Sequence, residues 1–250
     1  MNNNIKFFSI ILLFTGILIN YYYINLNYDL YKEFTLVFYI TYISYYILEG
    51  ILNQTDNSFR NIIPIHKKMY VVKNYIKSLF LAVLCLYLDK LTNILNDKID
   101  LLFIKKCAIY YVMNDIIGLL IVEKLPFTTK IHHITTSLCA LAVVMKKNNN
   151  LDIITLIVIY AIFSSMAFCV NFYLGLRVYS KNNELKRFLS KISFWIYLLC
   201  CLISWIFQIY LAKIVIPLVP IWHSLLYFCF LYSVCKDDII LMNWLYNDKK

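Results

Sequence analysis

Two adjacent histidines, His132 and His133, lie in the segment KLPFTTKIHHITTS, close to the start of a long apolar run. An acidic residue, Asp115, lies within the preceding apolar run, AIYYVMNDIIGLLIV. A positioned imidazole can act as a general base, and a neighbouring carboxylate can orient the ring and stabilise the imidazolium. The sequence therefore predicts that His132, His133 and Asp115 are the catalytic residues, if the chain is an enzyme.

The turn between these two runs predicts that the acid and the histidines meet. Pro126 suits the first position of a helix, so a helix is expected to begin there. In an antiparallel hairpin centred on Lys124, Asp115 is level with His133. Successive residues on a helix point about 100° apart, so one histidine is expected to face Asp115 and the other the interior of a helix bundle.

Further polar residues are expected on the same helix faces. Tyr111 and Gly118 share the face of Asp115 at helical spacing, which would supply a phenol and room for a close neighbour. Thr136 follows the two histidines and extends their polar stripe. Tyr111 and Thr136 are therefore predicted to bind substrate.

A second group of candidate substrate-binding residues precedes the hairpin. His66, in the segment IPIHKK, is expected to approach the hairpin from a loop. Arg60, Lys67 and Lys68 are close to it in the sequence and could attract phosphate groups at the mouth of the site. The alternative for these three is the ordinary excess of basic residues on the cytosolic side of membrane proteins.

Structural hydrogen bonding and metal binding are the alternatives to catalysis. Histidine and aspartate inside a membrane can serve only as hydrogen bonds between helices, typically worth about 0.6 kcal/mol each. A zinc site is commonly marked by two histidines four residues apart, and neither HxxxH nor HxxHH occurs in this sequence. No metal and no bound cofactor is therefore predicted.

The composition places the chain among membrane proteins. Hydrophobic residues make up 62% of it and the mean hydropathy is +0.68, whereas soluble domains are about 45–50% apolar. The net charge of +10 arises from basic residues that lie between the apolar runs. Membrane lipids are therefore the predicted partners, and nucleic acid is not. The eight cysteines contain no CxxC pattern and predict no disulfide framework.

Eight apolar windows are long enough to cross a bilayer core, which takes about 20 helical residues. The predicted fold class is therefore all-α, a polytopic transmembrane helix bundle of seven or eight spans. The last two windows are divided only by Lys213, Pro217 and Pro220. The windows cover residues 5–24, 33–52, 74–92, 106–123, 126–145, 151–175, 192–214 and 216–235.

The distribution of basic residues predicts the topology of this integral, multi-pass protein. With eight spans, Lys and Arg are more frequent in the connections on the N-terminal side than in those on the opposite side. By the positive-inside rule, both termini are expected to face the cytosol. The hairpin that carries the histidines then opens toward the cytosol too.

The order of these features resembles a known family. A lone histidine in RNIIPIHKKMYVV, a membrane acid, and KLPFTTKIHH leading into a Thr-rich helix are similar to the TLC domain. The resemblance covers residues 60–235, with N-terminal spans in 1–59 and a cytosolic tail in 236–250. It implies a helical bundle in the endoplasmic reticulum or a related membrane, including that of a host.

The family resemblance implies two different functions. Ceramide synthases of this family transfer an acyl group from acyl-CoA to a sphingoid amine, using the histidine pair and two further aspartates in the next helix. In this chain Asp152 is the sole acid of that next helix, so the pattern is incomplete.

One hypothesis is therefore acyl transfer to a lipid amine or hydroxyl, with acyl-CoA as co-substrate. The other is a non-enzymatic protein that senses lipids, adjusts membrane composition or escorts proteins. Homo-oligomers or other membrane proteins are further expected partners.

Overall fold

The computed structural model describes residues 28–64, 66–87, 100–147 and 152–248. Within these ranges every regular element is helical and no strand occurs, so the predicted all-α class is confirmed. The elements are α2 (Tyr28–Thr55), α3 (Asn57–Arg60), α4 (His66–Cys85), α6 (Leu101–Ile121), α7 (Phe127–Met145), α8 (Ile153–Ser165), α9 (Phe168–Leu176), α10 (Asn183–Val215), the 3-10 turn η2 (Ile216–Leu218) and α11 (Ile221–Asp248).

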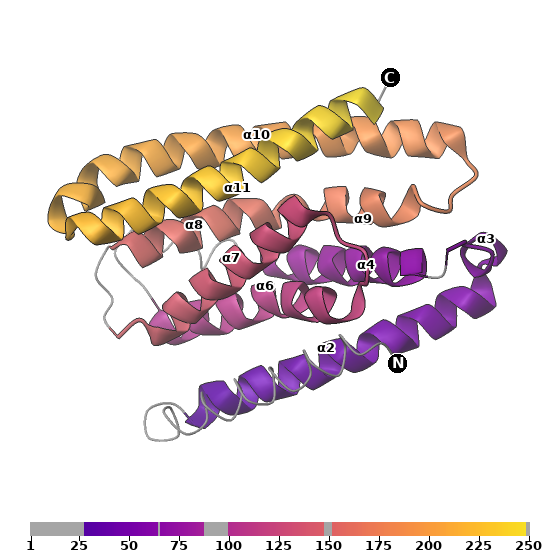
Figure 1. Ribbon diagram of the computed structural model, residues 1–250, viewed down its shortest axis with the longest axis horizontal. Coiled ribbons are helices and arrows are strands. Elements are labelled where there is room, and N and C mark those ends of the chain that lie inside the picture. The colour runs from indigo at the N-terminus through magenta and orange to yellow at the C-terminus, as the bar shows by residue number, and fades with distance from the viewer. Residues whose placement is uncertain (1–27, 65, 88–99, 148–151, 249–250) are drawn as a thin grey trace.

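The helices lie roughly side by side along the long axis of the molecule (Figure 1). Helices α10 and α11 form one edge and α2 the opposite edge, with α4, α6, α7, α8 and α9 between them. Helix α4 packs along α9, and α6 packs against α7 as a hairpin. The interior that positions the candidate site is therefore formed mainly by helices from the middle of the sequence.

Side-chain caps explain where several helices begin. The Asp100 carboxylate accepts a hydrogen bond from the Phe103 amide at the start of α6, and the Asp152 carboxylate accepts one from the Thr155 amide at the start of α8. Pro126 immediately precedes α7, within one residue of its predicted start. The turn of the histidine hairpin thus lies where the sequence predicts it.

Two helices are long and apolar enough to cross a membrane, Asp29–Thr55 and Asn183–Leu218. The helices Ile153–Ser165 and Phe168–Leu176 meet this criterion together, as one span bent by 50°. By this criterion the described residues contain two candidate spans, or three with the bent pair, and the seven or eight spans stay a prediction. The predicted window 5–24 lies outside the described residues, and so do residues 88–92 of the window 74–92.

Charged residues explain why other predicted spans fall short of this criterion. Helix α4 contains four lysines, α6 contains two lysines and an aspartate, and α11 contains a Lys-Asp-Asp sequence near its middle. Each of these charges interrupts the apolar length that defines a candidate span.

The C-terminal helices are longer than their predicted windows. Helix α10 begins at Asn183 and α11 continues to Asp248, and the turn η2 around Pro217 separates them. The prolines thus mark a real break between the last two predicted windows. Residues 236–248, predicted as part of a cytosolic tail, continue α11 without interruption.

Large apolar side chains cover the outer faces of the edge helices. Trp222 is 73% exposed, Leu226 71% and Tyr232 70%, all on α11, and α2 and α10 carry similar residues. Soluble monomers rarely expose contiguous apolar surface of this kind. These faces suit contact with lipid.

Candidate functional site

The α6–α7 hairpin brings Asp115 and His133 together, as its register predicts. The Nδ1 atom of His133 lies 3.2 Å from Oδ1 of Asp115, and the two side chains are 7% and 0% exposed. The two residues are level because each lies a similar number of residues from the turn. The predicted contact is confirmed, whereas its catalytic role stays a prediction.

His132 points to a different neighbour. Its Nδ1 atom lies 3.4 Å from Oδ2 of Asp237 on α11, and the two side chains are 19% and 23% exposed. The two imidazole rings are 5.6 Å apart and nearly perpendicular, as expected for successive positions on a helix. One histidine therefore faces Asp115 and the other faces the last helix.

Two lysines of α4 complete the site. Lys77 Nζ lies 2.6 Å from Oδ1 of Asp115, and Lys73 Nζ donates a hydrogen bond of 2.8 Å to Nε2 of His133. Gly118 provides the space for Lys73, because a Cβ atom at position 118 would lie 2.9 Å from Cε of Lys73. The predicted room beside Gly118 thus exists, and a lysine side chain occupies it.

Thr136 and Tyr111 border this group as predicted. The Thr136 hydroxyl donates a hydrogen bond of 3.2 Å to Oδ2 of Asp115. The Lys77 ammonium group lies 4.5 Å from the centre of the Tyr111 ring, and the Tyr111 hydroxyl is hydrogen-bonded to Ser164 at 2.9 Å. We refer below to the polar cluster, which consists of Lys73, Lys77, Asp115, His132, His133, Thr136 and Asp237.

The structure does not bring the second predicted group into the polar cluster. His66 begins α4, seven residues and thus about 10 Å before Lys73, and no hydrogen bond or ion pair among the described residues joins it to the cluster. Arg60 instead donates hydrogen bonds to the carbonyls of Asn53 (2.7 Å) and Gln54 (3.2 Å) at the C-terminal end of α2.

The two lysines of this group differ in their surroundings. Lys68 donates a hydrogen bond of 2.8 Å to the side chain of Asn53, and its ammonium group lies 5.6 Å from the centre of the Phe59 ring. Lys67 is exposed. Arg60 and Lys68 therefore fasten the end of α2 to the connection before α4, whereas Lys67 has no such role in the described contacts.

Sequence analysis missed Lys73, Lys77 and Asp237. The two lysines are four residues apart in the otherwise apolar stretch VVKNYIKSLF, which places them on one helix face and could have indicated a polar interior. Asp237 follows a predicted span and was assigned to the tail. The apolar residues on both sides of it, YFCFLYSVC and IILMNWL, could have indicated a continuous helix.

The polar cluster contains equal numbers of ammonium and carboxylate groups. Two ammonium groups, Lys73 and Lys77, lie near two carboxylates, Asp115 and Asp237, so the cluster is neutral overall when both imidazoles are neutral. Charges buried without partners are strongly unfavourable, whereas paired and hydrogen-bonded charges are tolerated. This balance accounts for the two lysines and two aspartates within an apolar bundle.

Three members of the cluster have the identities of metal ligands. Asp115, His132 and His133 each offer a ligand atom, and these atoms lie within 4.8 Å of one another. Two ammonium groups stand directly beside these ligands, however, at Asp115 and at His133. They would repel a divalent cation. The donor set therefore fits an ion-pair network better than a metal site.

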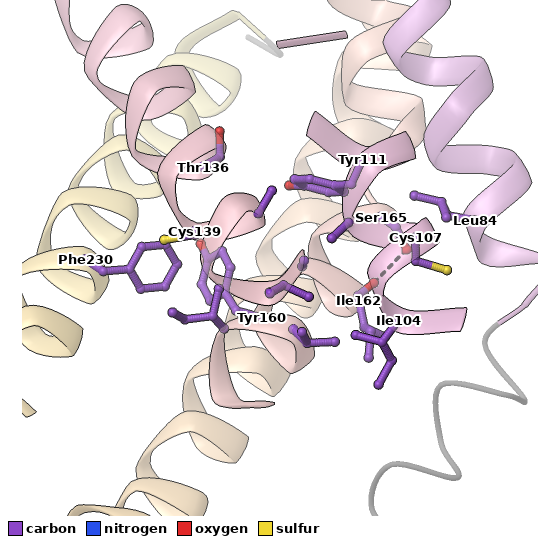
Figure 2. Close-up of a pocket in the computed structure, with 16 residues that line it drawn as sticks. Leu84, Ile104, Cys107, Tyr111, Thr136, Cys139, Tyr160, Ile162, Ser165 and Phe230 are labelled. Carbon is purple, nitrogen blue, oxygen red and sulfur yellow. Dashed lines mark hydrogen bonds between the residues drawn. The ribbon is translucent and has the colours of Figure 1, made fainter. Parts of the chain in front are cut away.

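An apolar pocket adjoins the polar cluster (Figure 2). It has a volume of about 70 Å³ and is lined mainly by α6, α7 and α8, with Leu84 from α4 and Phe230 from α11. Thr136 and Tyr111 lie toward one end of the lining, and Ile104 and Ile162 lie toward the other. Because Thr136 also binds Asp115, the pocket meets the polar cluster at this end.

Comparisons of the chain with family models, with curated proteins and with solved structures found no match. The resemblance to the TLC domain therefore stays a prediction.

Proposed function

We propose that this chain is a multi-pass membrane protein that holds a membrane lipid with its polar end at the polar cluster and the first few carbons of its acyl chain in the adjoining apolar pocket. One observation carries the proposal: Thr136 lines the pocket and also donates a hydrogen bond to the buried Asp115. An amphiphile needs this combination, because its polar end requires hydrogen-bonding partners and its chain requires an apolar lining.

The direction of the pocket supports the same proposal. Along α6, the pocket lining runs from Ile104 to Tyr111, seven residues or about 10 Å, and Asp115 lies about one turn beyond Tyr111. The pocket therefore follows the helix axes from the polar cluster into apolar surroundings. A lipid chain would lie parallel to the helices, as it does in a bilayer.

The buried charges support more spans than the two or three that helix length and hydropathy identify among the described residues. Ionisable residues within a membrane face the interior of a bundle and pair with one another. Lys77 of α4 pairs with Asp115 of α6, and His132 of α7 lies beside Asp237 of α11. We therefore propose that α4, α6, α7 and α11 cross the membrane together with α2, the bent α8–α9 pair and α10.

The predicted span 5–24 lies outside the described residues; counted as an eighth span, it puts both termini on one side of the membrane, and the positive-inside rule favours the cytosol. A TLC-like bundle in the endoplasmic reticulum or a related membrane, including that of a host, fits this arrangement. The family resemblance of residues 60–235 motivates this part of the proposal.

The proposed lipid site could have one of two activities, acyl transfer or non-catalytic sensing and escort, and a different observation supports each. Acyl transfer from an acyl-CoA to a lipid amine or hydroxyl is supported by the two imidazoles, each of which has a carboxylate within 3.4 Å. Lipid sensing or protein escort without catalysis is supported by the charge balance of the polar cluster, which needs no substrate to complete it.

A photoreactive, alkyne-tagged fatty acid tests the lipid site itself. Membranes that contain the chain would be illuminated and the labelled peptides identified by mass spectrometry. We expect labels on α6, α7 and α8, and we expect Ala140→Leu, which fills the pocket, to remove most of them. Ala142→Leu lies on the same helix outside the pocket lining and is the matched control. Equal labelling of both variants would refute the lipid site.

Lipid analysis separates the two activities. The chain and its His132→Ala/His133→Ala variant would be expressed at equal levels in cells that lack ceramide synthases. A lipid class that rises with the parent chain alone supports acyl transfer. Unchanged lipids, with the fatty-acid label still in the pocket, support sensing or escort.

A further inference from the structure

Both ring nitrogens of His133 face charged side chains. Its Nε2 accepts a hydrogen bond from Lys73, and its Nδ1 lies 3.2 Å from Asp115. The side chain is 7% exposed, and Ser137 on the next turn donates a hydrogen bond to its backbone carbonyl. A proton acceptor needs a free lone pair that a substrate can reach. His133 offers none, because the ammonium group of Lys73 occupies its Nε2.

His132 differs from His133 in exposure and at Nε2, whereas Nδ1 of each ring lies near a carboxylate and lacks a hydrogen bond among the described residues. The side chain of His132 is 19% exposed, and its Nδ1 faces Asp237 at 3.4 Å. Among the described residues, no hydrogen bond or ion pair occupies its Nε2. His132 therefore combines an accessible ring nitrogen with a carboxylate on the opposite side of the ring, which is the arrangement of a general base and its orienting group.

The contact of His132 with Asp237 is close but not well aligned. Nδ1 of His132 is buried and lacks a hydrogen bond among the described residues, although Oδ2 of Asp237 is only 3.4 Å away. Hydrogen bonds at catalytic sites are often long or misaligned before substrate binds and tighten when it does. A small rotation of either side chain would complete this bond.

We propose that the two adjacent histidines have different tasks. His132 takes the proton of a lipid amine or hydroxyl, Asp237 is its positioning residue, and His133 is a fixed member of the ion-pair network. This assignment deepens the proposed function and rests on it for the identity of the substrate. The TLC resemblance implies two aspartates in the helix that follows the histidines, whereas the carboxylate beside His132 is that of Asp237 on α11.

The proposed step balances with an acyl thioester as co-substrate. The nucleophilic nitrogen or oxygen of the lipid attacks the thioester carbonyl, and its proton passes to Nε2 of His132 as the new C–N or C–O bond forms. The C–S bond then breaks, and the thiolate takes the proton from His132 and leaves as a thiol. Asp237 holds the Nδ1 proton of His132 throughout and stabilises the imidazolium.

Modification with diethyl pyrocarbonate tests this division without requiring a lipid. The reagent acylates accessible neutral imidazoles. The full chain in liposomes would be treated for increasing times, and mass spectrometry would give the rate at each histidine. The exposed His223 is an internal reference. We expect His132 to be modified several-fold faster than His133.

Variants of Asp237 test its positioning role. We expect Asp237→Asn to slow the modification of His132 several-fold relative to His223, because the ring loses its orienting carboxylate. Asp237→Glu keeps the carboxylate and should restore most of the rate. Asp238→Asn makes the same change of charge one residue away and should leave the rate unchanged, since Asp238 bonds instead to the hydroxyls of Tyr160 and Tyr197.

The outcomes separate this inference from the proposed function. Two outcomes would overturn the inference. One is faster modification of His133 than of His132, and the other is the same rate of His132 modification in the Asp237→Asn variant as in the parent chain. If the chain binds no lipid, but the modification rate of His132 still depends on Asp237, the proposed function fails and the assignment of the His132–Asp237 pair stands.

Thermal unfolding checks each variant for folding. His133→Asn should lower the midpoint more than His132→Asn, and the reverse order would also contradict the division.

Discussion

Lys77 and Asp115 form the closest ion pair of the polar cluster, with Nζ and Oδ1 2.6 Å apart and side chains that are 9% and 0% exposed. The lysine comes from α4 and the aspartate from α6, so the pair joins two helices. Because neither group has more than slight access to solvent, each depends on the other for compensation of its charge.

Removal of one partner of this pair should be strongly destabilising. We expect Lys77→Met to lower the free energy of unfolding by about 3–5 kcal/mol, because it leaves Asp115 with one fewer compensating charge. Thermal or denaturant unfolding in detergent would measure the loss. The double variant Lys77→Met/Asp115→Leu should lose less than the sum of the two single variants, and strict additivity would contradict direct coupling.

Substitution by alanine should affect stability differently at Gly118 in α6 and at Gly50 in α2. A Cβ atom at Gly118 would lie 2.9 Å from Lys73, so we expect Gly118→Ala to push the lysine away from His133 and to destabilise the chain by about 1–3 kcal/mol. Gly50→Ala is the control, since nothing lies within 4 Å of its position. That variant should gain about 0.5–1 kcal/mol from the helix alone. Stabilisation by both substitutions would show that Lys73 moves without loss.

A buried hydrogen bond fastens α2 to α6. The Tyr45 hydroxyl donates to Oδ1 of Asn114 at 2.7 Å, and both residues are fully buried. Tyr45→Phe leaves this amide oxygen without its partner, so we expect a loss of about 1–3 kcal/mol. Limited proteolysis after α2 should become faster. Tyr46→Phe removes only an exposed hydroxyl contact with Tyr42 and should leave both measurements unchanged.

The basic residues before α4 should separate into structural and dispensable ones. We expect Arg60→Gln and Lys68→Gln each to lower stability by about 1 kcal/mol, because each removes hydrogen bonds to the end of α2. Lys67→Gln should stay within about 0.5 kcal/mol, since the residue is exposed. Unfolding experiments measure all three. If the Lys67 variant lost fatty-acid or acyl-CoA binding without losing stability, its predicted role in attracting phosphate would be supported.

Local sequence determined the helices and the contact within the hairpin. Apolar runs predicted the helical class, and Pro126 predicted the start of α7 within one residue. The contact between Asp115 and His133 followed from their similar distance to one turn. Such features depend on residues close together in the chain, where helix periodicity and turn chemistry decide the geometry.

The tertiary structure alone decided what completes the site. Lys73 and Lys77 reach the hairpin from α4, and Asp237 reaches it from α11, more than a hundred residues after Asp115. The predicted windows 74–92 and 216–235 cover parts of both helices, but they leave out Lys73 and Asp237, because these charges lower the local hydropathy. Whether a charge ends a span or pairs inside a bundle depends on which helices pack together. That choice is made by long-range packing, which no local pattern records.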